Sequence, residues 1–303
     1  MKEMTDFQRK ISAFLPEIEL RFEESMAKHT SFRIGGGAEV MAFPKNREEL
    51  AEIFKVSALL DSKPAILGAG TNVLAPDQGM KGLVICLKDC LDGMEQLDNT
   101  RIRLMAGVTM SRGATFAAGL GLSGLEFAHG IPGSIGGGVY MNAGAYGGEI
   151  CQVCESVEVM DRKGNIRRLS NAEMKFSYRH SVLEESGDIV ISADFMLTPK
   201  PSEEIKAYMK ELIGRRSVSQ PLDLPSAGSA FKRPVGGYAA ALIDQAGMKG
   251  YRVGGAAISD KHAGFAVNLG NATAEDVKKL LRDVSDKVFE KSGIRIEPEI
   301  RIW

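Results

Sequence analysis

Glycine is concentrated in one stretch of this sequence, AHGIPGSIGGGVYMNAGAYGGEI, which runs from Ala128 to Ile150. Eight glycines fall between Gly130 and Gly148, and no charged side chain lies among them. Glycine loses more conformational freedom on folding than any other residue, about 0.5–1 kcal/mol each relative to alanine in regular structure. We therefore expect a compensating contact, in which a bound group lies directly against the main chain.

A second glycine turn occurs earlier, in AILGAGTNVL, where Gly68 and Gly70 follow a predicted strand. A Rossmann dinucleotide site would need a third glycine in place of Val73 and a helix directly after it. The sequence continues with a turn and another strand, so no helix dipole is available. Main-chain N–H groups curled into a nest, with side-chain donors from Thr71 and Asn72, could hold phosphates there. A tight hairpin without a ligand is the alternative.

Two such segments that converge would enclose an extended, phosphate-bearing ligand. The longer segment offers main-chain N–H groups at Gly133 and Ser134, and the consecutive glycines Gly136–Gly138 leave flat room for a ring system. The sequence therefore predicts a dinucleotide cofactor that is bound without a Rossmann motif.

Isoleucine alternates with charged residues near the C-terminus, in the segment IRIEPEIRI. A period of two predicts a β-strand with one apolar and one charged face. Glu299 and Arg301 then point the same way, roughly 7 Å apart. An ordinary half-exposed strand would show the same pattern, so this strand alone assigns no chemistry to the carboxylate.

Ser229 lies between Gly228 and Ala230, two small residues that leave space for a ligand beside its hydroxyl. Serine is a weak acid, and its proton would pass only to a strongly basic partner. A loop serine that is hydrogen-bonded to the main chain is the alternative at this position.

These segments are positioned by predicted strands and helices on either side of a boundary near residue 200. Before the boundary, Asn46 caps a helix whose first turn carries two acidic residues. The predicted strands before it are Pro64–Gly68, Leu83–Leu87, Ile102–Ala106 and Asp188–Leu197, with a hairpin at Val157–Leu169. After it, helices begin at Ser202 and Thr273, and a third covers Gly237–Ala246.

The composition is that of an ordinary soluble protein, with 303 residues, 44% hydrophobic residues, 25% charged residues and a net charge of -1. Nothing in this balance favours nucleic acid, and apolar runs such as Leu83–Leu87 are far short of the ~20 residues of a membrane span. The N-terminus lacks the apolar core of a signal peptide. We expect an intracellular protein whose four cysteines are reduced, and no metal site. The absence of a Gly-Lys dipeptide excludes a P-loop nucleotidase.

Eight motifs occur in order along nearly the whole chain: HTSFRIGG, GAGTNVL, GIPGSIGG, MNAGAYG, FSYRHS, PSAGSAFKRP, KHAGFAVN and EPEIRI. Together they closely resemble the MurB family, UDP-N-acetylenolpyruvoylglucosamine reductase. The absence of a long insertion after YRHS resembles the shorter, type II branch. The resemblance implies an α+β, FAD-binding fold of the PCMH/VAO type, noncovalent FAD, NADPH as electron source, a UDP-sugar substrate and peptidoglycan precursor synthesis in the bacterial cytoplasm.

The resemblance also implies the site residues. Ser229 matches the proton donor, Arg179 the group that holds developing negative charge, and Glu299 the catalytic glutamate. Tyr178 and Lys232 are expected to bind substrate. From the glycine segments and the resemblance together, the residues expected to bind FAD are Gly68, Ala69, Gly70, Thr71, Asn72, Val73, Gly130, Pro132, Gly133, Ser134, Gly136, Gly137, Asn142, Gly144, Arg216 and Arg301.

In this interpretation residues 1–200 form the FAD-binding region, with lobes at about 1–60 and 61–200 to which residues 297–303 return. Residues 201–296 form the substrate-binding domain. We expect a monomer without nucleic-acid or membrane partners. Another FAD-dependent oxidase of the same superfamily and a non-catalytic flavin-binding module are the alternatives.

Overall fold

The computed structural model of the protein describes residues 3–88 and 90–303, and its chain forms two compact units. The first unit comprises Met1–Phe22, Val40–Ala69 and Gly82–Arg215. The second comprises Glu23–Glu39, Gly70–Lys81 and Arg216–Trp303. Within the described ranges, none of the helices combines the length and the apolar composition needed to cross a membrane.

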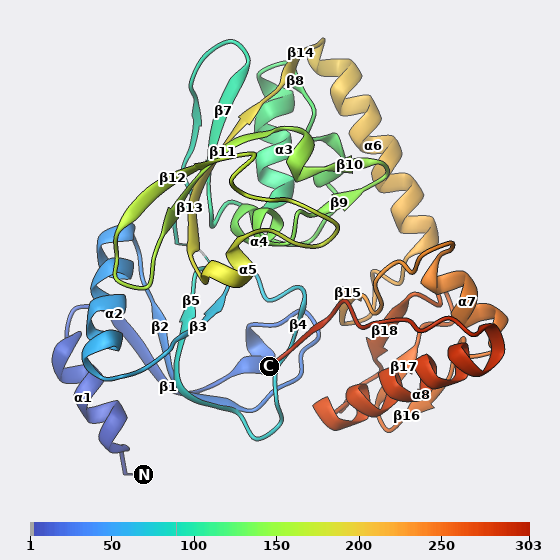
Figure 1. The fold of residues 1–303 in the computed structure, drawn as a ribbon, viewed down its shortest axis with the longest axis horizontal. Coiled ribbons are helices and arrows are strands. Elements are labelled where there is room, and N and C mark those ends of the chain that lie inside the picture. The colour runs from blue at the N-terminus through green and yellow to red at the C-terminus, as the bar shows by residue number, and fades with distance from the viewer. Residues whose placement is uncertain (1–2, 89) are drawn as a thin grey trace. The chain divides into compact units, whose positions relative to one another are not determined.

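Helices and strands are interspersed along the chain (Figure 1), which confirms the predicted α+β class. The α-helices are α1 (Asp6–Phe14), α2 (Arg47–Leu59), α3 (Met110–Gly119), α4 (Ile135–Tyr140), α5 (Leu183–Ser186), α6 (Ser202–Ser219), α7 (Ala239–Gln245) and α8 (Ala274–Ser292). The short 3₁₀ helices are η1 (Met26–Lys28), η2 (Glu126–Ala128) and η3 (Ile150–Gln152).

The strands are short and numerous. They are β1 (Glu19–Ser25), β2 (Gly37–Phe43), β3 (Ala65–Leu67), β4 (Val73–Leu74), β5 (Met80–Cys86), β6 (Met94–Gln96), β7 (Arg101–Met105), β8 (Leu122–Ser123), β9 (Gly144–Ala145), β10 (Gly148–Glu149), β11 (Cys154–Met160), β12 (Ile166–Ser170), β13 (Ile189–Met196), β14 (Thr198–Pro199), β15 (Ser226–Ser229), β16 (Arg252–Val253), β17 (Ala256–Ile258), β18 (Phe265–Asn268) and β19 (Arg301–Ile302).

The first unit contains a five-stranded antiparallel sheet in the order β12-β11-β13-β7-β6. Helix α4 packs against β13 and β7, and α3 packs against α4 (Figure 1). The central strand β13 is buried at every residue except Met196, which explains its nearly continuous apolar sequence. Its one carboxylate, Asp194, accepts two hydrogen bonds from Arg103 at 2.7 and 2.9 Å, and burial of this charge is thereby compensated.

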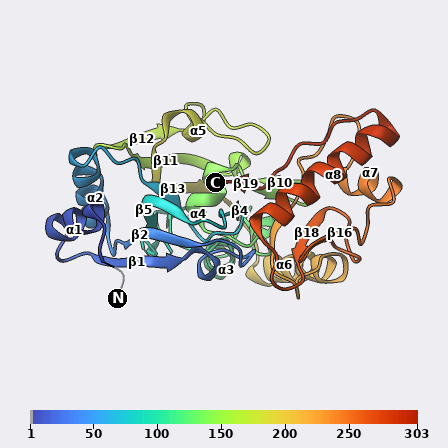
Figure 2. The same cartoon turned by 90° about the horizontal axis from the view of Figure 1, so that it is seen from below.

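A second sheet has the order β1-β2-β5-β3, and α1 and α2 lie side by side at one end of it (Figure 2). The predicted cap of α2 is confirmed, because the side-chain oxygen of Asn46 accepts a hydrogen bond from the Glu49 amide at 2.9 Å. Strand β3 pairs in parallel with β5, and the glycine turn follows β3 directly.

The second unit contains the four-stranded antiparallel sheet β15-β18-β17-β16, against which α8 packs (Figure 2). The predicted start of α8 is confirmed by a capping box between Thr273 and Asp276. The helix ends at Gly293, which adopts the left-handed conformation. Five apolar residues of this helix are buried in the core of the unit: Val277, Leu280, Leu281, Val284 and Val288.

The long C-terminal strand predicted from the isoleucine repeat is wrong in its extent. Only Arg301–Ile302 form a strand, β19, and Ile302 is 47% exposed although Ile296 and Ile300 are buried. Pro298 interrupts the segment, since proline cannot donate a ladder hydrogen bond, and it pairs with Phe231 only through an isolated bridge.

Candidate functional site

The first glycine turn is shaped by close packing within the protein. Gly70 has φ +65°, and a side-chain carbon added there would lie 2.0 Å from the carbonyl oxygen of His29. The turn leads into β4 at Val73 and then into β5, with no helix between them. The prediction of a turn that lacks the Rossmann helix is therefore confirmed.

The turn is divided between the two units. Gly68 and Ala69 belong to the first unit, whereas Gly70, Thr71, Asn72 and Val73 belong to the second. Within the described residues, the main-chain N–H groups of Ala69, Gly70 and Asn72 donate no hydrogen bond. The anion nest expected from the sequence would need such donors, and it stays a prediction.

The second glycine segment is not the open, flat loop that we expected. Gly136–Gly138 lie in helix α4, which is capped by the side chain of Ser134. An added carbon at Gly136 would lie 3.0 Å from the Ala106 side chain, and one at Gly138 only 2.6 Å from the sulfur of Met110. Close packing against α3 and the preceding loop therefore accounts for Gly136 and Gly138, and the flat-room interpretation is wrong for the buried Gly138.

Gly137 differs from its two neighbours because it faces open space. A carbon added there would meet only the hydroxyl of Ser134, at 3.6 Å. The same hydroxyl would lie 3.1 Å from a carbon added at Gly68, so the two glycine segments meet at Ser134 within the first unit.

The main chain at this meeting point offers unused donors. The N–H groups of Gly133 and Ser134 form no hydrogen bond with any described residue, although Ser134 is buried. Gly133 is fixed through its carbonyl oxygen, which accepts from the Met110 amide at 3.0 Å. A buried N–H without a partner is rare, because it costs as much as a lost hydrogen bond. Unpaired amides beside surfaces without side chains fit the phosphates of a dinucleotide such as FAD.

Farther along this segment, the side chain of Asn142 forms hydrogen bonds to other residues of the protein. Its side chain is 1% exposed, donates to the carboxylate of Glu149 at 3.1 Å and to the Ser177 carbonyl at 3.0 Å, and accepts from the Cys151 amide at 2.9 Å. These bonds hold the turn that carries Tyr178 and Arg179 against the glycine segment.

Arg179 occupies a strained main-chain position, with φ +56°. It lies in the tight turn between Ser177 and His180, where each amide donates to the other residue's carbonyl. Its guanidinium donates to the carbonyl oxygen of Gly144 at 3.2 Å and stacks over the half-exposed ring of Tyr178 at 4.9 Å. The predicted charge-holding arginine is thus oriented by two contacts.

Ser229 and Glu299 both lie in the second unit, on neighbouring stretches of chain. Ser229 ends β15, is exposed, and its hydroxyl makes no hydrogen bond with any described residue. The Glu299 amide donates to the carbonyl of Ala230 at 2.9 Å, and the Lys232 amide donates to the carbonyl of Glu297 at 2.8 Å. The alternative of a loop serine bound to the main chain therefore has no support here.

The predicted basic residues differ in their surroundings. Lys232 forms an exposed ion pair with Glu297 at 3.3 Å, which is weak enough to be exchanged for a ligand anion. Arg216 lies in the last turn of α6 and is half-buried, whereas the adjacent Arg215 pairs with Glu211 on the helix surface. Arg301 is half-buried in β19.

Three residues with structural roles were not predicted from the sequence, although Ser31 and Asn268 lie in two of the motifs described above. The Ser31 hydroxyl, in HTSFRIGG, donates to the Ser226 carbonyl at 2.6 Å, and the Ser31 amide donates to Gly70. Asp77 accepts hydrogen bonds from the first two amides of α8 and so caps a helix distant in sequence. The third, Asn268, binds the Phe32 carbonyl at 3.1 Å. No local pattern specifies such long-range partners.

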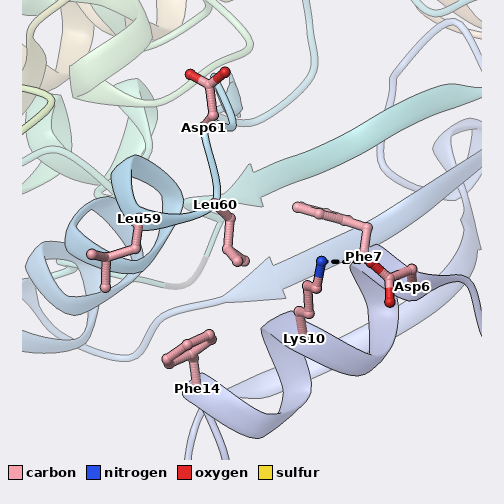
Figure 3. A pocket seen from close by; sticks show the side chains of 7 residues that line it. All are labelled: Asp6, Phe7, Lys10, Phe14, Leu59, Leu60 and Asp61. Atoms are coloured by element: carbon pink, nitrogen blue, oxygen red, sulfur yellow. Dashed lines mark ion pairs between the residues drawn. The ribbon is translucent and has the colours of Figure 1, made fainter.

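A cavity of about 440 Å³ opens elsewhere in the first unit, between α1 and the end of α2 (Figure 3). Its lining is mixed, with Phe7, Phe14, Leu59 and Leu60 beside the ion pair of Lys10 with Asp6 and the carboxylate of Asp61. None of the predicted site residues is among those that line it.

Family models match both the N-terminal and the C-terminal part of the chain. A family model described as the FAD binding domain matches residues 38–170, and one described as the UDP-N-acetylenolpyruvoylglucosamine reductase C-terminal domain matches residues 220–303. Proteins named UDP-N-acetylenolpyruvoylglucosamine reductase from Agathobacter rectalis and Caldanaerobacter subterraneus are 44% and 47% identical, over 98% and 97% of this chain and 98% and 96% of theirs.

A solved structure is similar over nearly the whole chain. The crystal structure of UDP-N-acetylenolpyruvylglucosamine reductase (MurB) from Thermus caldophilus has 36% sequence identity and a TM-score of 0.77, and the match covers 95% of this chain and 99% of that one. The predicted FAD-binding fold is thereby confirmed. The chain belongs to the UDP-N-acetylenolpyruvoylglucosamine reductase family, a family of FAD-dependent oxidoreductases.

Proposed function

We propose that the protein uses NADPH and FAD to reduce the enolpyruvyl group of UDP-N-acetylenolpyruvoylglucosamine to UDP-N-acetylmuramate, in peptidoglycan precursor synthesis. The observation that carries the proposal is the match, over 97–98% of the chain, to relatives that bear the reductase name. The neighbouring positions of Ser229 and Glu299 support it, because the reaction needs a proton donor beside a carboxylate.

The cofactor residues proposed above would hold FAD mainly through main chain. The amides of Ala69, Gly70, Asn72, Gly133 and Ser134 would bind its phosphates, and Arg216 and Arg301 would add positive charge. When bound, FAD supplies the chemistry of hydride transfer from NADPH to the vinyl carbon of the substrate.

Three side chains would complete the reduction. Ser229 gives a proton to the carbon next to the one that receives hydride, and Glu299 orients that hydroxyl, directly or through water. Arg179 stabilises the enolate that forms beside the substrate carboxylate, since a guanidinium can donate two parallel hydrogen bonds. Tyr178 and Lys232 bind the UDP-sugar.

We assign FAD binding to residues 1–200 together with 297–303, and substrate binding to residues 201–296. We also propose that the protein works in the cytoplasm as a monomer. Analytical ultracentrifugation of the FAD-loaded protein should give a single species near the 32.7 kDa of the chain.

The test is to purify the protein, record its absorption spectrum and reduce it anaerobically with NADPH. The expected result is a yellow protein that NADPH bleaches and that UDP-N-acetylenolpyruvoylglucosamine reoxidises. Reoxidation by O₂ with an alcohol or aldehyde as electron donor would indicate an oxidase of the same superfamily. Binding of FAD without turnover of any of these compounds would indicate a flavin-binding module.

A further inference from the structure

We infer that Asn72 is a positioning residue that sets the main chain of Glu299, and that it acts on the reaction through that carboxylate. This inference rests on the proposed function. The sequence suggested that the side chain of Asn72 donates to phosphate. In the structure this side-chain amide donates to the main chain of Glu299 instead.

The evidence is a set of hydrogen bonds within the second unit. The side-chain amide of Asn72 donates to the carbonyl oxygen of Glu299 at 3.2 Å. The carbonyl oxygen of Asn72 accepts from the Arg301 amide at 3.0 Å, so Asn72 binds the chain at Glu299 and again two residues later. The parallel pairing of β4 with β19 continues this register, with Val73 opposite Arg301.

The Glu299 main chain is therefore held from two directions. Its N–H donates to the carbonyl of Ala230, the residue after the proposed proton donor, and its C=O accepts from Asn72. These two bonds fix the direction of the Glu299 Cα–Cβ bond, because they hold the peptide groups on both sides of its Cα.

The turn that carries Asn72 is itself fixed at its other end. The Gly70 carbonyl accepts from the Ser31 amide at 3.0 Å, and the Ser31 hydroxyl donates to the carbonyl of Ser226 in β15. Ser229 ends the same strand. Ser31 and Asn72 thus connect the glycine turn to both stretches of chain that carry the proposed proton-transfer groups, which gives HTSFRIGG a positioning role.

An amide is the side chain that this contact requires. Alanine at position 72 would remove this hydrogen bond to the Glu299 carbonyl, and aspartate would place a carboxylate oxygen against a carbonyl oxygen. Misplacement of a catalytic group by about 1 Å can cost about 10²-fold in rate. We therefore expect Asn72→Ala to slow the proton-dependent step by about tenfold to a hundredfold.

The experiment follows flavin absorbance by stopped flow at saturating FAD, first during reduction by NADPH and then during reoxidation by UDP-N-acetylenolpyruvoylglucosamine. Asn72→Ala and the isosteric Asn72→Asp should both lower the limiting reoxidation rate while the half-saturating substrate concentration and the NADPH rate change less than about threefold. The solvent deuterium isotope effect on reoxidation should rise, since proton transfer becomes more rate-limiting.

Ser285→Ala is the matched control. The Ser285 hydroxyl donates to the Ile296 carbonyl at 2.9 Å, so this variant also removes one side-chain hydrogen bond to the C-terminal segment, but at a residue that does no chemistry. It should lower Tm as much as Asn72→Ala does and leave the reoxidation rate unchanged.

A double-mutant cycle with Glu299→Gln decides whether Asn72 acts through the carboxylate. In the Glu299→Gln background, Asn72→Ala should have little further effect. Full additivity, an unchanged reoxidation rate, or a loss confined to FAD affinity would overturn the inference. If the wild-type enzyme fails to reoxidise with the substrate, the proposed function fails first, and the two failures are therefore distinct.

Discussion

The N–H of Glu299 donates a hydrogen bond to the carbonyl oxygen of Ala230, at 2.9 Å. Ala230 directly follows Ser229, so this bond joins the stretch that bears the proposed proton donor to the stretch that bears the proposed carboxylate. Both stretches belong to the second unit, and the bridge between Phe231 and Pro298 continues their antiparallel arrangement. The pairing brings Ser229 and Glu299 onto neighbouring stretches of chain, as the proposed reaction requires.

Replacement of Ser229 by alanine should separate the two half-reactions. Bleaching of the flavin by NADPH needs no proton from this hydroxyl and should keep its rate, whereas reoxidation by the enolpyruvyl substrate should slow by about 10²–10⁴-fold. Stopped-flow absorbance measures both rates on one sample. Equal damage to the two half-reactions would contradict the role of Ser229 as proton donor.

Local signals predicted four helices, α2, α6, α7 and α8, and part of the strands, whereas α1, α3, α4 and α5 were not predicted. Asn46 and Thr273 accept the capping hydrogen bonds that their positions predicted, because a cap involves residues within one turn of the chain. The isoleucine repeat near the C-terminus failed as a strand at Pro298, where tertiary pairing with Phe231 replaced a regular ladder. Periodicity alone could not show this.

The sequence suggested candidate site residues, but it could not predict the contacts that support them. The free amides at Gly133 and Ser134 agree with the sequence prediction, since a glycine-rich loop exposes its main chain. The packing of Gly138 against Met110, the cap that Asp77 places on α8, and the bond from Asn72 to Glu299 were not predictable. Each joins residues that are distant in sequence and that only the folded chain brings together.

Gly137→Ala should test whether a ligand lies against the second glycine segment. The new methyl group meets only the Ser134 hydroxyl, at 3.6 Å, so the apoprotein should tolerate it and gain about 0.5–1 kcal/mol from better helix propensity in α4. FAD affinity should nevertheless fall at least tenfold, because the methyl group occupies the open surface. Fluorescence titration of the apoprotein with FAD and thermal unfolding without FAD give the two quantities.

Gly138→Ala is the matched control for that prediction. A methyl group there would lie 2.6 Å from the sulfur of the buried Met110, which should destabilise the apoprotein by about 1–3 kcal/mol through overpacking. If Gly137→Ala destabilised the apoprotein, or if it folded normally and kept its FAD affinity, no ligand would lie against Gly137.

The cysteines should differ in their reaction with iodoacetamide. Burial raises the pKa of Cys90 and of Cys154 to about 12, so at pH 8 only ~10⁻⁴ of either thiol is the reactive thiolate. Burial also raises the pKa of Cys151, but this side chain is partly exposed and should react first. Mass spectrometry of the native protein over time measures the order, and unfolding in guanidinium should make all four cysteines react. Modification of native Cys154 as fast as Cys151 would contradict the packing described.

Lowering the pH should destabilise the folded second unit through protonation of His262, in the KHAGFAVN motif. Burial lowers the pKa of His262 from its ordinary value of 6.5, and its Nδ1 accepts a hydrogen bond from the Gly264 amide at 3.0 Å. Because the unfolded chain then binds this proton more readily than the folded one, His262 contributes stability at neutral pH that is lost as pH falls below about 6.5.

His262→Asn should abolish this part of the pH dependence. The Gly264 carbonyl accepts from the Ala230 amide at 2.8 Å, so protonation of His262 disturbs a residue that also supports the chain beside Ser229. The Tm of the wild type should therefore fall between pH 7 and pH 5 more steeply than that of the variant, as measured by circular dichroism in buffers of equal ionic strength. His129→Asn is the control, because it leaves the Gly264 contact intact and should retain the wild-type difference between the two pH values. Identical slopes for the wild type and His262→Asn would assign the acid sensitivity to other groups.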